Sequence, residues 1–338
     1  MTKNGEVREG DLPEVHWVGD IDPESSMLGL PVLEKVRRTM LYRAKPETGT
    51  YSHHGYITSH DGALVATWSN HARDEDAPGQ RVLWSRSTDE GETWATWDEL
   101  FPPQDEVKPS KKQDDAVDRV LIANGFAVAE DCLYSIAEEH VMENRRGLGR
   151  LARQTYPDGR TGPIFWLRED PPAPREGFPV YPDASDPEFA DRARRINAWL
   201  DRPEHWPSWE FLHQTSRPKA ADGHQLCEPT QAWKLEEGTY VRLWRDIGDP
   251  RSGRNYAQFS FDDGEEWTDP VQTDFPDACS RSAAGRLPDG TTYVINNPGD
   301  TRDPLAISLA NDGLTFDRHG VIVSGAPPKR YEGRAKGI

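Results

Sequence analysis

The chain has 338 residues, which is enough for one large all-β domain or two ordinary domains. Its formal net charge of −18 disfavours nucleic acids and anionic membranes as partners, because their phosphates would be repelled. The charge does not exclude a small anionic ligand, since a few convergent arginines reverse the local potential. The 28 glycines, 28 prolines and 12 tryptophans predict many short strands joined by turns around large buried aromatic rings.

The cysteines and the N-terminus suggest the setting of the protein. The three cysteines, Cys132, Cys227 and Cys279, are an odd number and lie far apart, so we expect neither a disulfide framework nor a metal site. The first ten residues are polar and lack the apolar centre of a signal peptide, and no apolar run has the length of a membrane span. We therefore expect a cytoplasmic protein without a cofactor, and the sequence gives no support for a structural Ca²⁺ ion.

In chain order, the first predicted element is a strand at 36–43, and four similar units follow it. Each unit opens with two strand-like runs joined by a short acidic turn, then has a third strand, a tight turn and a fourth strand. The paired runs are 55–59 with 63–69, 120–128 with 132–137, 230–235 with 240–244, and 282–287 with 292–295.

The tight turn before each fourth strand has a repeated sequence. Ser87–Trp94 reads STDEGETW, Ser260–Trp267 reads SFDDGEEW, and Leu309–Phe316 reads LANDGLTF, with Asn in place of the first Asp. Thr155–Thr161 is a degenerate further copy. The Asp or Asn side chain can accept hydrogen bonds from nearby backbone N–H groups, and Gly allows the positive φ of a tight turn. We expect the closing Trp or Phe to fill the space between neighbouring sheets, and the turns to be scaffold.

A repeated unit of four strands is the pattern of a β-propeller blade. The sequence predicts one all-β domain over 1–338 with blades at about 53–101, 118–168, 228–273 and 280–324. The chain stops soon after the fourth blade. The ring is therefore expected to stay open at its C-terminal side, with apolar sheet faces exposed, unless a leading strand within 32–43 closes it.

An insertion at 170–226 interrupts the repeat between the second and third blades. It contains a predicted helix with Asp186 as N-cap and Pro187 at the first helical position, and Pro203 should end it. Phe189, Ala193, Ile196 and Leu200 follow at helical spacing. Two interpretations stay open, a lid over a site and a purely structural addition.

The repeated turns resemble the Asp-box, or bacterial neuraminidase repeat, superfamily of sialidase-like propellers. The segments Tyr51-Ser52-His53-His54, Trp68-Ser69-Asn70 and Gln80-Arg81 are similar to the branch with propeller α-L-rhamnosidases and rhamnosyl-glucuronate lyases. The resemblance implies a carbohydrate-active enzyme. The Phe-Arg-Ile-Pro motif of true sialidases is absent from the sequence.

The topology of a blade predicts which face does chemistry. Starts of first and third strands and ends of second strands meet on the face opposite the Asp-box turns, where the loops are long. We expect four catalytic candidates on this face, His53, His54, Glu228 and Asp246. The candidates for substrate binding are Asn70, His71, Arg81, His140, Arg245, Arg281, Asn297 and Arg302.

Simpler roles are open for some of these residues. Arg245 and Asp246 can form an ion pair that braces the rim, and His140 can be a solvated loop residue. Because successive side chains of a strand alternate between its faces, only one of His53 and His54 should reach a common pocket. We rate a metal site low, because the spacing of metal ligands is absent.

Arginines grip carboxylates through paired hydrogen bonds, and a neutral histidine can move a proton near neutral pH. A site with both fits an anionic sugar such as a uronate, so we expect an enzyme that cleaves a terminal bond next to a uronic acid. The resemblance implies that this bond links rhamnose to glucuronate. Hydrolysis with Glu228 and Asp246 as the carboxyl pair and β-elimination both stay open, and His with Arg fits elimination slightly better. The alternatives are a non-catalytic propeller that binds glycan or protein and, second, an exo-sialidase.

Overall fold

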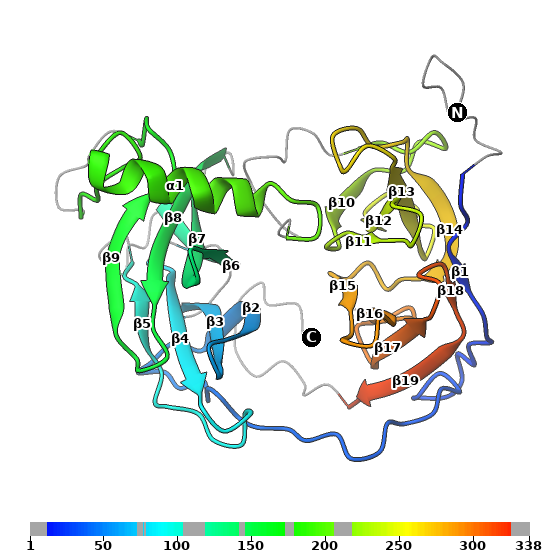
Figure 1. Cartoon of the computed structure of the whole chain (residues 1–338). Coiled ribbons are helices and arrows are strands. Elements are labelled where there is room, and N and C mark those ends of the chain that lie inside the picture. The colour runs from blue at the N-terminus through cyan, green and yellow to red at the C-terminus, as the bar shows by residue number, and fades with distance from the viewer. Residues whose placement is uncertain are drawn as a thin grey trace.

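Four antiparallel sheets stand around a common axis in the computed structural model, which describes residues 12–72, 77, 79–103, 119–141, 146–172, 179–205 and 218–325 (Figure 1). We number these sheets as blades 1 to 4 in chain order. The innermost strand of each blade comes first in the chain and the outermost comes last. The predicted all-β propeller of four blades is confirmed for the described residues.

Blades 1 and 2 have the regular order of four strands that the paired runs predict. Blade 1 consists of β2 (Tyr51–His60), β3 (Ala63–His71), β4 (Arg81–Ser87) and β5 (Asp98–Phe101). Blade 2 consists of β6 (Arg119–Ala129), β7 (Cys132–Val141), β8 (Arg146–Thr155) and β9 (Thr161–Trp166).

Blades 3 and 4 are less regular at the axis. Blade 3 consists of β10 (Leu226–Pro229), β11 (Trp233–Lys234), β12 (Tyr240–Asp246), β13 (Arg254–Ser260) and β14 (Val271–Pro276). Its innermost strand is split, since β10 and β11 both pair with β12. Blade 4 consists of β15 (Ala283–Arg286), β16 (Thr292–Asn296), β17 (Leu305–Ala310) and β19 (Arg318–Val323), with β18 (Thr315–Phe316) beside it.

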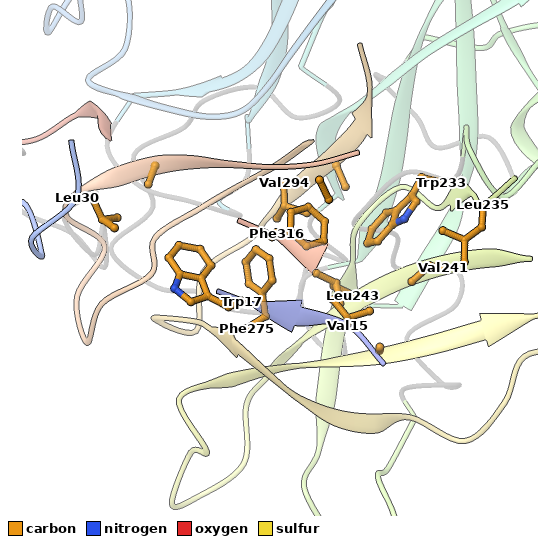
Figure 2. Packing of buried hydrophobic residues seen from close by; sticks show 14 of the residues in the cluster. Val15, Trp17, Leu30, Trp233, Leu235, Val241, Leu243, Phe275, Val294 and Phe316 are labelled. Carbon is orange, nitrogen blue, oxygen red and sulfur yellow. The ribbon is translucent and has the colours of Figure 1, made fainter. Parts of the chain in front are cut away.

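The N-terminal segment lies against blades 3 and 4. Strand β1 (His16–Trp17) runs parallel to β18, and Val32 forms a parallel bridge with Val321 of β19. Figure 2 shows Val15, Trp17 and Leu30 packed among residues of both blades, with Phe275 and Phe316 at the centre. This segment therefore binds the two blades together through a shared core.

The strand predicted at 36–43 is wrong. Those residues form no strand and do not pair with 321–323, because the backbone contacts of β19 are made earlier, by Pro31, Val32 and Leu33. The segment instead crosses from blade 4 to blade 1 as an extended connection (Figure 1). Leu41 and Tyr42 pack on Trp68 and Leu83 of blade 1, where they cover part of its sheet face.

The described hydrophobic clusters separate the propeller into two halves. One cluster joins blades 1 and 2, and another joins blades 3 and 4 with the N-terminal segment. None of the clusters formed by described residues contains side chains of both halves. On blade 4, Ile295 and Ile307 are only half-buried, whereas the alternate residues Val294 and Ala306 are buried. The face of blade 4 that carries Ile295 and Ile307 is thus only partly covered.

The helix predicted in the insertion is present as α1 (Pro187–Leu200). Asp186 caps it by accepting a hydrogen bond from the Glu188 N–H at 2.9 Å, and its four predicted apolar residues are buried against blade 2. Beyond the helix, the carbonyl of Pro203 accepts from the Ala232 N–H, and Glu204 accepts from the Tyr240 hydroxyl at 2.9 Å. The described part of the insertion therefore braces blade 2 against blade 3.

The Asp-box turns form as predicted in blades 1 and 3. Asp89 and Asp262 each accept a backbone N–H four residues ahead, from Thr93 and Glu266, both at 2.9 Å. In blade 4 the acceptor is Asp312 rather than Asn311, and it takes the N–H groups of Leu314 and Thr315.

The closing aromatic residues differ in burial from one box to the next. Phe316 is fully buried, but Trp267 is partly exposed and stacks on the guanidinium of Arg242 at 3.8 Å. The expectation that each box residue fills the space between sheets therefore holds for Phe316 and not for Trp267.

Candidate functional site

The innermost strands leave regular geometry where they approach the axis. Register shifts occur between His53 and Tyr56 in β2, between Ala123 and Phe126 in β6, and between Cys227 and Pro229 in β10. His54 and Glu228 adopt positive φ at these shifts, as does Cys279 just before β15. A β-bulge changes the direction in which nearby side chains point. Here the affected side chains lie on the face of the propeller away from the Asp boxes.

His53 and His54 lie together because of this bulge. Their ring centroids are 4.3 Å apart, so the alternation that predicted opposite faces does not hold. His53 is accessible to solvent, whereas His54 is buried with its Nδ1 3.1 Å from the Ser69 hydroxyl. The solvent-facing histidine of the pair is therefore His53, with His54 packed behind it.

The charges around His53 come from the opposite half of the propeller. The pKa of His53 is lowered to about 4, first by the protein atoms that displace water and then by Arg281, Arg302 and Arg245, against the opposing effect of Glu228. These side chains come from blades 3 and 4, so the group spans the axis. His53 is consequently a neutral imidazole near neutral pH and can accept a proton.

Glu228 and Arg245 form an ion pair within this group. Their side chains meet at 2.9 Å, and the Arg245 Nε–H also points at the Cys227 sulfur at 3.1 Å. Arg281 donates a hydrogen bond to the Tyr56 hydroxyl of blade 1, and its guanidinium lies 5.0 Å from the centre of that ring. The Tyr56–Arg281 contact joins the two halves directly.

Arg302 supplies a positive charge that the described residues leave without a counter-ion. Its hydrogen bond goes to the backbone carbonyl of Cys279 at 3.4 Å, and no carboxylate of the described residues contacts it. Asn297 holds the loop that carries Arg302 by donating to the carbonyls of Arg302 and Pro304. Asn297 thus supports the site from behind.

Asp246 does not belong to this group. It follows Arg245 on β12, and its carboxylate accepts from the His224 ring at 2.8 Å and from the N–H groups of Gly248 and Ser252. Burial opposes its ionisation, but the amides of Ser252 and Gly248 outweigh it, so the pKa of Asp246 is lowered. Asp246 anchors the loop after β12, and Arg245 forms its ion pair with Glu228 and not with Asp246.

Three other predicted residues, Asn70, Arg81 and His71, lie in blade 1. Asn70 donates to the Tyr51 carbonyl of β2 at 3.0 Å and accepts from Arg81 at 3.0 Å. Arg81 also binds Glu99 and the Thr48 carbonyl, so this pair ties the strands of blade 1 together. His71 is half-buried at the end of β3, opposite Tyr51.

His140 has a supporting position. It is fully buried, not a solvated loop residue, and its charge would lower the pKa of His54. It therefore lies behind the two histidines of blade 1.

Sequence reasoning missed three residues of the site: Tyr56, Cys227 and Asp277. Tyr56 reads as an ordinary strand residue, and Cys227 as a small buried one. Asp277 follows a proline in an apparent surface turn, yet it is buried, and burial raises its pKa to about 6. No local pattern could have found these residues, because Tyr56 and Asp277 meet the arginines only in the folded structure and Cys227 meets Arg245 only through the pairing of β10 with β12.

The described residues offer no cluster of three or more histidine, cysteine or acidic side chains that could hold a metal ion. Within the same ranges, no helix is both long and apolar enough to cross a membrane.

The fold and the Asp-box turns define a sialidase-type β-propeller, and comparison with known families agrees. The model of the BT_1020-like, N-terminal beta propeller family matches residues 31–206, a little more than half of the chain. The chain belongs to this family. A second model, the BNR repeat-like domain, matches residues 192–331.

One solved structure of a similar protein shares the fold, and two others are more distant. A sialidase is similar over 95% of this chain and 31% of its own, with a TM-score of 0.74 and 21% identity. The chain therefore spans about a third of that protein's length. A Trypanosoma rangeli sialidase in complex with sialic acid is 16% identical over 88% of this chain and 43% of its own, with a TM-score of 0.35. A Dyadobacter fermentans protein of unknown function is 12% identical over 83% and 71%, with a TM-score of 0.38. No curated protein matches the chain.

Proposed function

We propose that this chain is a carbohydrate-active enzyme that cleaves a terminal bond next to a uronic acid, of the rhamnose–glucuronate type. The observation that carries the proposal is Arg302, a guanidinium without a described carboxylate partner, placed with Arg281 near a neutral His53. An anionic sugar supplies the missing counter-charge, because guanidinium and carboxylate groups match in shape and charge.

β-Elimination is the reaction that these groups support best. His53 takes the proton next to the uronate carboxylate, and a double bond forms in the uronate ring as the bond from the adjacent ring carbon to the glycosidic oxygen breaks. That oxygen keeps the electron pair of the broken bond and takes a proton from water, so that rhamnose leaves as the free sugar. Arg302 and Arg281 stabilise the negative charge that develops on the carboxylate as the proton departs. The two-carboxyl arrangement of hydrolysis is less favoured, because Asp246 is fixed elsewhere.

The test uses oligosaccharides that end in rhamnose linked to glucuronate, with carboxyl-reduced versions of the same oligosaccharides and sialyllactose as comparisons. We expect release of rhamnose and an ultraviolet absorbance from the unsaturated product, and no reaction of the reduced form. Rhamnose release without that absorbance would indicate hydrolysis. Release of sialic acid alone, or binding without turnover, would replace the proposal with a sialidase or a glycan-binding propeller.

Variants connect the activity to the site. Arg302→Ala should abolish most turnover, and Arg302→Lys should recover little, since an ammonium cannot replace the two-pronged guanidinium. Arg318→Ala is the matched control, because Arg318 lies at the Asp-box end of the same blade and contacts Asn311 and Asp317. Equal losses in both alanine variants would contradict the proposed site.

A further inference from the structure

A short turn before β15 carries the Cys279 carbonyl and the Arg281 side chain, which both take part in the site. The turn begins at Asp277, whose N–H donates to the Gly253 carbonyl, while the Ala278 N–H donates to the Asn297 carbonyl, both at 3.0 Å. Cys279 has a φ of 56° and offers its carbonyl to Arg302. Arg281 then reaches Tyr56. The conformation of this turn therefore sets the positions of two of the three arginines.

Asp277 holds the turn from inside the protein. Its side chain accepts the Ser280 N–H at 3.3 Å, and the residue is only 5% exposed. The second carboxyl oxygen, Oδ2, is inaccessible and has no hydrogen-bond partner among the described residues. A buried carboxyl with one unsatisfied oxygen favours the protonated form, because an isolated charge is costly to bury.

One charged side chain acts on Asp277 from a neighbouring element. Arg245 of β12 does so, and it is already paired with Glu228 of β10. The backbone of Asp246 has a small lowering effect on the pKa of Asp277, while the Asp246 carboxylate is turned to His224, Gly248 and Ser252. Cys279 and Arg281 belong to the same turn. Arg245 thus forms an ion pair with Glu228 and also lowers the pKa of Asp277 through its charge.

We propose that Asp277 is a positioning residue of the site: protonated, it holds the arginine-bearing turn and leaves Arg245 to Glu228, and ionised, it competes with Glu228 for Arg245. The consequence for an anionic substrate has a clear sign. A negative charge at Asp277 lowers the positive potential of the neighbouring arginines, so a uronate should bind more weakly when Asp277 is ionised. This consequence rests on the proposed function, whereas the competition for Arg245 does not.

The experiment follows the Arg245 side chain directly. The Nε–H signal of Arg245, assigned with Arg245→Lys, is measured by nuclear magnetic resonance across about pH 5 to 8 in the wild type and in Asp277→Asn. Asn keeps an oxygen that can accept the Ser280 N–H but cannot ionise. The matched control is Asp289→Asn, because Asp289 also accepts a backbone N–H in a blade 4 turn, from Thr291, but it lies in the hairpin between β15 and β16.

We expect the Arg245 signal to shift through about pH 6 in the wild type and in Asp289→Asn, and to stay constant in Asp277→Asn. A shift that persists in Asp277→Asn would overturn the proposal, as would a constant signal in the wild type. If Asp277→Asn does not fold, Asp277→Ser keeps a turn-capping oxygen and takes its place.

A second titration separates this inference from the proposed function. Binding of free D-glucuronate should weaken several-fold between about pH 5 and 7.5 in the wild type and remain level in Asp277→Asn. If glucuronate does not bind at any pH while the Arg245 signal behaves as expected, the positioning role stands and the proposed substrate is wrong. Binding that weakens equally in both proteins would contradict the role of Asp277 in substrate recognition.

Discussion

His53 is accessible to solvent yet has a strongly lowered pKa. These two properties together predict how the activity depends on pH. With a pKa of about 4, the ring is the free base throughout the neutral range. At saturating substrate, the rate of a reaction that requires this base should rise as pH increases through about 4 and then level off, with no step near the ordinary histidine value of about 6.5.

Substitution of His53 tests whether this residue is the base by measuring the rate of the chemical step. His53→Ala should lower the chemical rate by roughly 10²–10⁴-fold, as expected for loss of a general base, while the thermal midpoint changes little. His60→Ala is a suitable control, because His60 lies at the other end of β2 and contacts the Asp131 carbonyl. A rise through about pH 6.5 in the rate of the wild type at saturating substrate would show that another histidine is the base.

Asp277 makes the stability of the protein depend on pH. Because its folded-state pKa is raised from 3.8 to about 6, the folded protein binds this proton more tightly than the unfolded chain. The associated stability is present below about pH 4 and is lost as pH rises to 6, by up to about 3 kcal/mol.

Asp277→Asn should remove this contribution. The free energy of unfolding in urea is measured for both proteins. The value for Asp277→Asn minus the value for the wild type should therefore grow as pH rises from about 4 to 7. A constant difference across that range would show that Asp277 does not titrate there.

At the level of single elements, the Asp-box turns are expected to differ in what they stabilise. Asp262→Ala removes the acceptor of the Glu266 N–H and the Ser260 hydroxyl and should lower the free energy of unfolding. Phe316→Ala should cost about 3–5 kcal/mol, because the ring is fully buried against Trp233 and Phe275. Trp267→Ala should cost less than Phe316→Ala, since Trp267 is partly exposed.

Chemical denaturation of the three variants measures these differences. None of the substitutions should alter substrate preference in folded protein, since the turns lie at the other end of the strands from His53. If Asp262→Ala abolished turnover with an unchanged thermal midpoint, the working face would be the one with the Asp boxes.

At the scale of the whole molecule, the site lies between two halves that have separate cores. The Tyr56–Arg281 contact and the charges around His53 cross this division, and the insertion and residues 31–45 connect its edges. A ligand that binds both His53 and Arg302 therefore contacts both halves at once. This position allows substrate binding to stabilise the arrangement of the two halves.

Trp17→Ala tests whether the halves respond separately. Trp17 stacks on His319 at 3.7 Å between centroids and meets Phe275 edge-on at 5.2 Å, so its loss opens the core of blades 3 and 4. Amide hydrogen exchange should become faster in those two blades and remain unchanged in blades 1 and 2. The control is Trp97→Ala, which removes a partly buried ring from blade 1. It should make amide exchange faster in blades 1 and 2 and leave blades 3 and 4 unchanged. A uniform increase throughout the chain would show that one cooperative core joins all four blades.

Local sequence was sufficient for the repeated parts of the fold. Asp89 and Asp262 occupy turns that their own neighbours define, and Asp186 with Pro187 starts a helix whose buried face follows from spacing alone. The strand prediction at 36–43 was wrong because the apolar residues Leu41 and Tyr42 pack on the sheet face of blade 1 from an extended connection. Periodicity indicates that a segment is partly buried, but not what it packs against.

The sequence by itself determined the blades, the helix and the face on which polar residues gather, because hydrogen bonds and apolar spacing within a few residues define them. Only the tertiary structure decided which of those residues meet. It separated Asp246 from Glu228, placed His54 behind His53, and brought Tyr56 and Asp277 to arginines from distant strands. The physical reason is that a bulge of one residue redirects a side chain, and burial sets its pKa through groups that are far apart in the sequence.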